Sequence, residues 1–161
     1  MTDYDQNPFD ETDPERAAIW DMLVYRDIDA FSTNNWPGHA ECFLTEQFFG
    51  IDAQGTMDSD QWRLGFATLE EYKPNWVGDA QEAATKTNPE NLRRAHFDAT
   101  DMTQIDVNGD QAICHKKFDG SVTYDDGSVE RLLWKTIYQC RKVDGRWRVG
   151  SFIGFLPNEG V

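Results

Sequence analysis

The sequence predicts an α+β fold in which a curved antiparallel sheet wraps around a long N-terminal helix and leaves a cone-shaped pocket. Three observations lead to this prediction. Apolar side chains recur at helical spacing over residues 13–36. Long runs of strand character fill the carboxyl-terminal part and are separated by Asn-Gly or Asp-Gly turn signals. Helices thus precede a meander of strands, and in this order the sheet can fold over the first helix with a pocket between the layers.

The helix predicted at residues 13–36 begins with capping signals. Thr12 or Asp13 can cap its start, Pro14 suits the first turn, and Glu15 favours the positive end of the helix dipole. At about 100° per residue, six apolar side chains fall on one face. They are Ile19, Trp20, Leu23, Val24, Ala30 and Phe31.

Asp27 falls near the middle of this apolar face. A carboxylate turned into a core costs free energy unless it is paired, hydrogen-bonded or neutralised, and such groups are enriched at working sites. Two interpretations are open. Asp27 is a pocket acid or base with a pKa raised by desolvation. Alternatively, it ties down a backbone amide or an arginine, or lies at the rim of a rotated helix.

The rest of the chain divides at Pro, Gly and Asn signals. Thr87-Asn88-Pro89 indicates a loop, and Asp119-Gly120 indicates a bulge in a strand. In chain order, the predicted elements are a short helix at residues 38–46, a strand at residues 48–54, a helix at residues 57–73 that Pro74 ends, a further turn or two at residues 75–86, and strands at residues 92–106, 111–124, 129–143 and 146–156.

Length and charge bound the class of protein. The 161 residues predict an acidic tail at residues 1–12 and a single domain at residues 13–161. A net charge of −14 argues against nucleic acid and anionic membrane surfaces as partners. Neither an apolar run long enough to span a bilayer nor a signal peptide is recognisable, so we expect a cytoplasmic protein. No metal-ligand spacing and no glycine-rich phosphate loop occurs, so neither metal nor cofactor is expected.

Several stretches resemble a known superfamily. The order of elements, the Asn34-Asn35-Trp36 end of the first helix and the closing hairpin at residues 143–149 are similar to the nuclear transport factor 2-like superfamily with its cystatin-like cone. Within it, the sequence most resembles the SnoaL-like and scytalone dehydratase-like branch. Residues 92–97 resemble the dehydratase strand that carries a catalytic histidine, and His96 falls on that histidine. The resemblance covers about residues 14–157.

The resemblance also has departures. Phe31 and Ser32 stand where the dehydratase has its catalytic tyrosine and aspartate, so scytalone dehydration itself is not implied. Asp27 falls on a helix position that lines the pocket in this superfamily. Homodimers are usual in the superfamily, and the resemblance implies one here. Apolar residues on both faces of the last two predicted strands also favour a dimer, because one face lines the pocket and the other is left for an interface. Leu132, Trp134, Tyr138 and Phe152 would form one face, and Leu133, Ile137, Trp147 and Val149 the other.

The expected function is a cofactor-free acid/base lyase or isomerase, of dehydratase or cyclase type, that acts on a small apolar oxygenated molecule. Asp27 and His96 would be the catalytic pair, since a desolvated aspartate and a histidine can exchange protons near neutral pH. The expected substrate-binding residues are Arg94 and Tyr138, which would hold a substrate oxygen, and Phe31, Trp134 and Trp62, which would form apolar walls. The alternative is a non-catalytic module of the same fold that binds a small ligand or a protein.

The three histidines each have a structural alternative. His96 shares its predicted strand face with Arg94 and Asp98, a polar row that could face solvent. His115 is expected on the sheet surface, and His39 in a loop or at a helix start.

Overall fold

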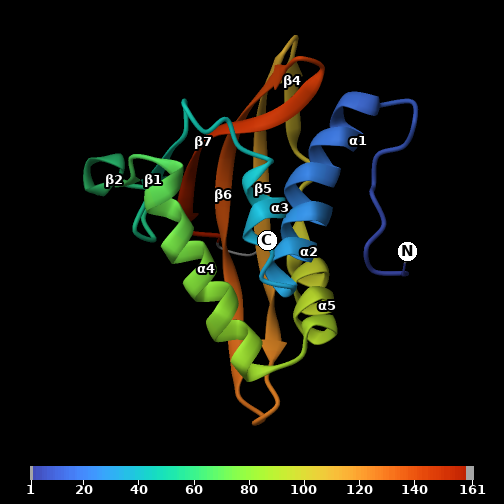
Figure 1. The fold of residues 1–161 in the computed structure, drawn as a ribbon, viewed down its shortest axis with the longest axis vertical. Coiled ribbons are helices and arrows are strands. Elements are labelled where there is room, and N and C mark those ends of the chain that lie inside the picture. Colours follow the sequence, from blue (N-terminus) through green and yellow to red (C-terminus); the bar gives the residue numbers. More distant parts are fainter. Residues whose placement is uncertain (1, 159–161) are drawn as a thin grey trace.

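The computed structural model describes residues 2–158, in which seven strands form one curved sheet beside the helices (Figure 1). Met1 and residues 159–161, which belong to the predicted tail and domain, lie outside the described residues. Across the sheet the strand order is β2-β1-β7-β6-β5-β3, and β4 pairs with β5. The strands are β1 (Phe49–Asp52), β2 (Arg63–Phe66), β3 (Thr100–Asp101), β4 (Ile105–Asn108), β5 (Gln111–Thr123), β6 (Val129–Val143) and β7 (Arg146–Leu156).

The predicted meander is confirmed for β5, β6 and β7, which pair antiparallel in chain order. At the β6–β7 turn, Asp144 and Gly145 adopt φ of 51° and 76°. These are the left-handed conformations that a two-residue hairpin turn requires. The sheet is not entirely antiparallel, because β1 runs parallel to β7.

The long N-terminal helix is also confirmed, in three consecutive segments: α1 (Pro14–Trp20), a π-helical turn η1 (Asp21–Arg26) and α2 (Asp27–Ser32). The Asp13 side chain caps it by accepting the backbone N–H of Arg16. The helix stops before Asn34, whose φ of 51° is left-handed. A separate short helix, α3 (Trp36–Ala40), follows in place of the predicted helix at residues 38–46.

The strand predicted at residues 92–106 is wrong over its first half. A helix, α5 (Pro89–Ala99), occupies this segment, and only the short β3 and β4 follow. The Asn88 side chain caps α5 by accepting the N–H of Asn91, at 2.9 Å, and Pro89 takes the first helical position. The Asn-Pro pair that indicated a loop is therefore a helix start.

The helix predicted at residues 57–73 is likewise displaced. Its first half forms a 3₁₀ turn, η2 (Ser59–Gln61), and the strand β2, and the helix α4 (Leu69–Lys86) begins only afterwards. The Thr68 side chain caps α4 by accepting the N–H of Glu71, whose carboxylate accepts the N–H of Ala67 in return. Pro74 does not end α4, because the proline and Glu70, whose carbonyl loses its hydrogen bond, are both exposed to water.

The predicted bulge at Asp119-Gly120 is absent, since β5 pairs with β6 in an unbroken register there. Gly120 serves close packing instead. A Cβ at this position would lie 2.6 Å from the Cβ of Ala99 at the end of α5. Glycine thus lets α5 approach the sheet.

Irregularities occur instead between β6 and β7, where the register shifts between Lys135 and Ile137 and between Gln139 and Cys140. The shift turns Trp147 and Val149 into the core, where they are 7% and 0% exposed. The expectation that both share the face of Leu133 and Ile137 is therefore wrong, because a bulge reverses the alternation along the strand.

The helices pack on the concave side of the sheet. In Figure 1, α4 crosses in front of the sheet on the left, and α1, α2 and α5 lie to the right. The segment before α1 is held against α5 by Asp5, which is buried and lies 3.0 Å from the guanidinium of Arg93. Tyr4 and Phe9 from the same segment pack against the main core.

Candidate functional site

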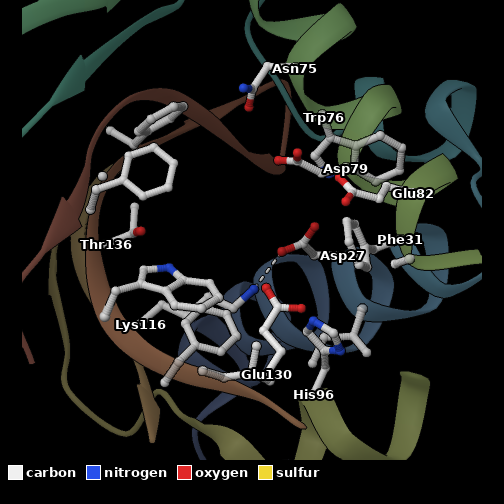
Figure 2. Close-up of a pocket in the computed structure, with 18 of the residues that line it drawn as sticks. Asp27, Phe31, Asn75, Trp76, Asp79, Glu82, His96, Lys116, Glu130 and Thr136 are labelled. Atoms are coloured by element: carbon white, nitrogen blue, oxygen red, sulfur yellow. Dashed lines mark hydrogen bonds and ion pairs between the residues drawn. The ribbon is translucent and has the colours of Figure 1, made fainter. Parts of the chain in front are cut away.

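A cavity of about 390 Å³ lies between the concave face of the sheet and the helices α2, α4 and α5. Strands β5, β6 and β7 contribute inward-facing side chains to its walls, and Figure 2 shows how the polar ones converge. Aromatic residues dominate: Phe31, Tyr72, Trp76, Phe118, Tyr124, Trp134, Tyr138, Phe152 and Phe155. The cavity falls within the volume range of small-molecule sites and has the same apolar character.

Asp27 lies in the wall of this cavity, as the helical pattern predicts. Its Oδ2 accepts a hydrogen bond from Lys116 Nζ at 2.5 Å. Both side chains line the cavity, but Lys116 is only 1% exposed whereas Asp27 is 18% exposed, so the carboxylate is the more accessible of the two. Burial would raise the pKa of Asp27, but Lys116 and His39 outweigh it and hold that pKa below its ordinary value. The expectation of a raised pKa is wrong, and Asp27 is ionised.

The π-helical turn η1 completes the shell of Lys116. Lys116 Nζ also donates to the backbone carbonyl of Leu23, at 2.5 Å. Leu23 lies within η1, and this turn ends at Arg26, the residue before Asp27. A π-turn disturbs the regular i→i−4 ladder, and such turns are frequent at functional sites. The carbonyl and the carboxylate together provide the ammonium group with the partners that burial demands.

His39 lies on the other side of Asp27. Its Nδ1 is 3.2 Å from Asp27 Oδ1, but the ring is not oriented to donate along that line, and neither ring nitrogen makes a hydrogen bond within the described residues. The ring stacks on Trp76, with 4.6 Å between centroids and 12° between planes. Burial lowers the pKa of His39 despite the nearby Asp27, so the ring is neutral at pH 7. The expectation of a loop or helix-start residue missed this buried contact.

His96 also lines the cavity, from helix α5 and not from a strand. Its Nδ1 lies 2.8 Å from the carbonyl oxygen of Leu92. A carbonyl can only accept, so the proton of the neutral ring is on Nδ1 and Nε2 carries the lone pair. Burial and the charge of Lys116 lower the pKa of His96, whereas the bond to Leu92 and the charges of Asp27 and Glu130 raise it, and the net result is a pKa below the ordinary value.

Three hydroxyl groups in the cavity are free to bind a ligand. Tyr72, Thr136 and Tyr138 line it, and their hydroxyls form no hydrogen bond within the described residues. Burial, followed by the charge of Asp27, raises the pKa of both tyrosines, so both stay protonated. They can donate to an oxygen of a bound molecule.

The predicted wall residues separate into two groups. Phe31, Trp134 and Tyr138 line the cavity. Arg94 does not: it is exposed on α5 and pairs with Asp98 at 3.6 Å, one helical turn away. Trp62 faces a separate shallow depression and donates its indole N–H to the carbonyl of Thr56. Both predictions depended on misassigned secondary structure, which changes the face on which a side chain emerges.

Lys116 was absent from the predicted site, although the sequence holds a signal for it. At a strand period of two, Lys116 shares a face with Ala112, Cys114 and Phe118, all of them buried. A lysine in such a row needs a carboxylate partner, and Asp27 was already predicted to point inward.

The described residues hold neither a metal-binding cluster nor a membrane-spanning helix. Within residues 2–158, no group of three or more His, Cys, Asp or Glu side chains is arranged to bind a metal ion. No helix in the same range has the length and apolar character needed to cross a membrane.

Comparison with solved structures identifies the architecture. A conserved protein from Planctomyces limnophilus superimposes with a TM-score of 0.61 at 14% identity, over 89% of this chain and 95% of that one. A protein with a cystatin-like fold from Nostoc punctiforme gives 0.56 at 12% identity, over 92% and 94%. An NTF-2-like protein of unknown function from Silicibacter pomeroyi gives 0.53 at 14% identity, over 90% and 98%.

The chain has the nuclear transport factor 2-like fold. No protein-family model matches its sequence, and no curated protein does. At these identities the likeness extends to the fold alone, and it does not single out the SnoaL-like branch. In this fold, the cone between helix and sheet is the cavity that holds Asp27, Lys116 and His96.

Proposed function

We propose that this protein binds a small, mainly apolar, oxygenated molecule in the cone and catalyses a cofactor-free proton transfer in it, as a lyase or isomerase of the SnoaL-like type. One observation carries the proposal. The Nδ1 proton of His96 is held by Leu92, which leaves Nε2 as a free base in a cavity that also holds the ionised Asp27. A positioned base in an apolar site contributes about 10²- to 10⁴-fold to a proton transfer.

His96 is the proton acceptor in this proposal. Its Nε2 takes a proton from the carbon next to a substrate carbonyl, and the C–H electron pair forms a C=C bond as the carbonyl oxygen becomes an enolate oxygen. The imidazolium returns the proton to a more distant carbon, which is isomerisation, or to a departing hydroxyl group, which leaves as water. The proton balance closes without a cofactor in either case.

Asp27 and the tyrosines support the charges that form. The negative charges of Asp27 and Glu130 favour the imidazolium form of His96 and counter the charge of Lys116, which disfavours it. The hydroxyl of Tyr138 or Tyr72 donates a hydrogen bond to the enolate oxygen. Lys116 keeps Asp27 ionised and fixed in position.

The proposal is tested with a panel of β,γ-unsaturated ketones and β-hydroxy ketones, by the ultraviolet absorbance of the conjugated enone that either reaction forms. We expect His96→Gln to lower the rate by about 100-fold or more and Asp27→Asn to lower it less. His115→Gln is the matched control, because His115 alternates with the inward-facing residues of β5. Equal rates for the wild type and His96→Gln refute the assignment of His96.

The second candidate is a non-catalytic binding module of the same fold. The hydrogen bond from Lys116 to Asp27 favours it, since an aspartate held by a buried cation already has a structural task. Saturable binding of members of the panel, without turnover of any of them, supports this candidate over the enzyme.

A further inference from the structure

Acidic groups outnumber basic ones around the cavity. Its lining includes the carboxylates of Asp27, Asp79, Glu82 and Glu130, and the ammonium groups of Lys86 and Lys116. Asp27 pairs with Lys116, and Glu82 with Lys86 at 3.2 Å. Asp79 and Glu130 are left without a cationic partner among the described residues, so the cavity carries two uncompensated negative charges.

These two carboxylates come from opposite walls. Asp79 belongs to α4 and Glu130 to the start of β6. Figure 2 shows Asp79, Glu82 and Glu130 with their carboxylates turned toward the space in front of Asp27. Burial raises the pKa of Asp79, and the like charges of Glu82 and Glu130 raise it further. The hydroxyl of Tyr124 donates to Glu130 and holds that carboxylate in place.

The aromatic walls suit a positive charge as well as an apolar body. Ammonium groups of the protein already lie over two of these rings: Lys86 Nζ is 5.0 Å from the centroid of Tyr124, and Lys116 Nζ is 5.3 Å from that of Phe118. The faces of aromatic rings attract ammonium groups. A neutral apolar molecule would gain from these walls but not from the carboxylates, and an anion would be repelled by them.

An independent observation indicates that the cavity is built for a ligand. Thr136 is 7% exposed, lies deep on β6, and its hydroxyl makes no hydrogen bond within the described residues. In Figure 2 this hydroxyl points into the cavity, across from Asp79 and Glu82. This hydroxyl is therefore free to form a hydrogen bond with a polar atom of a bound molecule.

We infer that the cone takes an organic cation, a molecule with an apolar body and an alkylammonium group that lies between Asp79 and Glu130. The inference rests on the proposed function only in that both place the ligand in the same cavity. It adds the charge of the ligand, and it places that charge between Asp79 and Glu130.

The test compares three ligands of one shape that differ in charge: 2-naphthylmethylamine, 2-naphthylmethanol and 2-naphthoate. Their binding to the full chain is measured by isothermal titration calorimetry. We expect the amine to bind roughly three- to tenfold more tightly than the alcohol, and the carboxylate to bind most weakly. The preference for the amine falls as the salt concentration rises. Equal affinities, a preference for the carboxylate, or no binding of any of the three overturns the inference.

Variants of the chain test whether the preference for the amine depends on Asp79. Asp79→Asn is expected to lower the amine-to-alcohol affinity ratio roughly two- to fivefold. Glu70→Gln is the matched control, because it removes the same charge from an exposed position of α4 outside the cavity. An unchanged ratio in Asp79→Asn overturns the placement. His96→Gln separates this inference from the proposed function: the amine preference persists in that variant even where no ketone is turned over.

Discussion

Lys116 donates one hydrogen bond to the carboxylate of Asp27 and another to the carbonyl of Leu23, and so joins strand β5 to the middle of the N-terminal helix. The two contacts join residues that are 93 and 89 positions apart in the sequence. They convert an aspartate on an apolar helix face into a fixed anion at the wall of the cavity.

Removing Lys116 alone is expected to lower the stability of the fold strongly. Lys116→Met leaves the Asp27 carboxylate without its main counter-charge, which costs about 3–5 kcal/mol for a buried pair. The double variant Asp27→Asn/Lys116→Met recovers much of this loss, because no unpaired charge remains. Urea unfolding at neutral pH measures both. A double variant as unstable as the single one contradicts the pairing.

Stability is expected to depend on pH through the buried histidines. Burial lowers the pKa of His39 and His96 below the ordinary value of 6.5. Below pH 6.5 the unfolded chain binds protons that the folded chain does not. The free energy of unfolding therefore falls as pH drops, by up to about 1.4 kcal/mol per pH unit for each histidine. Asp27, whose pKa is also lowered, adds a loss only below about pH 3.8.

The variant His39→Phe isolates one of these histidines. Phenylalanine fits between Phe43 and Trp76, which surround the ring, and does not titrate. We expect the pH slope of stability below pH 6.5 to become shallower in this variant. Urea unfolding over a series of pH values provides the slope, and the same slope in His39→Phe and the wild type contradicts the assignment.

The approach of α5 to the sheet depends on Gly120. Gly120→Ala brings a Cβ to 2.6 Å from the Cβ of Ala99 and is expected to destabilise the fold by about 1–3 kcal/mol. Ala99→Gly in the same chain removes the shortest of these contacts, leaves the Cα of residue 99 at 3.0 Å, and is expected to restore part of the stability. Gly78→Ala is the control, since no atom lies within 4 Å of its Cβ and alanine favours helix α4. Thermal unfolding gives the melting temperature of each variant. A melting temperature of Gly120→Ala as high as that of Gly78→Ala contradicts this packing.

The convex face of the sheet is our candidate for a homodimer interface. Ile113 and Leu133 are each 40% exposed there, which is unusual for large apolar side chains on a strand. We expect sedimentation to show a dimer at micromolar concentration and Ile113→Glu to shift it toward monomer. A wild-type monomer under these conditions refutes the interface.

Much of the architecture was predictable because its signals are local. The capped start at Asp13 and Pro14, the Asp144-Gly145 turn and the inward direction of Asp27 each follow from residues a few positions apart. The α+β order of elements follows from local signals of the same kind.

The errors arose where a local signal was ambiguous or where partners are distant in sequence. Asn88-Pro89 can begin a loop or a helix, and the wrong choice placed His96 on a strand and Arg94 in the cavity. The contact of His39 with Asp27 joins separate elements, and no short pattern indicates it. For Lys116, the period-two row of β5 indicates burial, and only the fold shows that Asp27 lies opposite.

Hydrogen exchange at carbon tests the central claim most directly. A ketone that binds the cone is incubated with the protein in D₂O, and the deuterium that enters the carbon next to the carbonyl is measured by mass spectrometry. The account predicts incorporation at a rate well above that without protein, lost in His96→Gln and retained in His115→Gln. Binding of the ketone without any protein-dependent incorporation would contradict it.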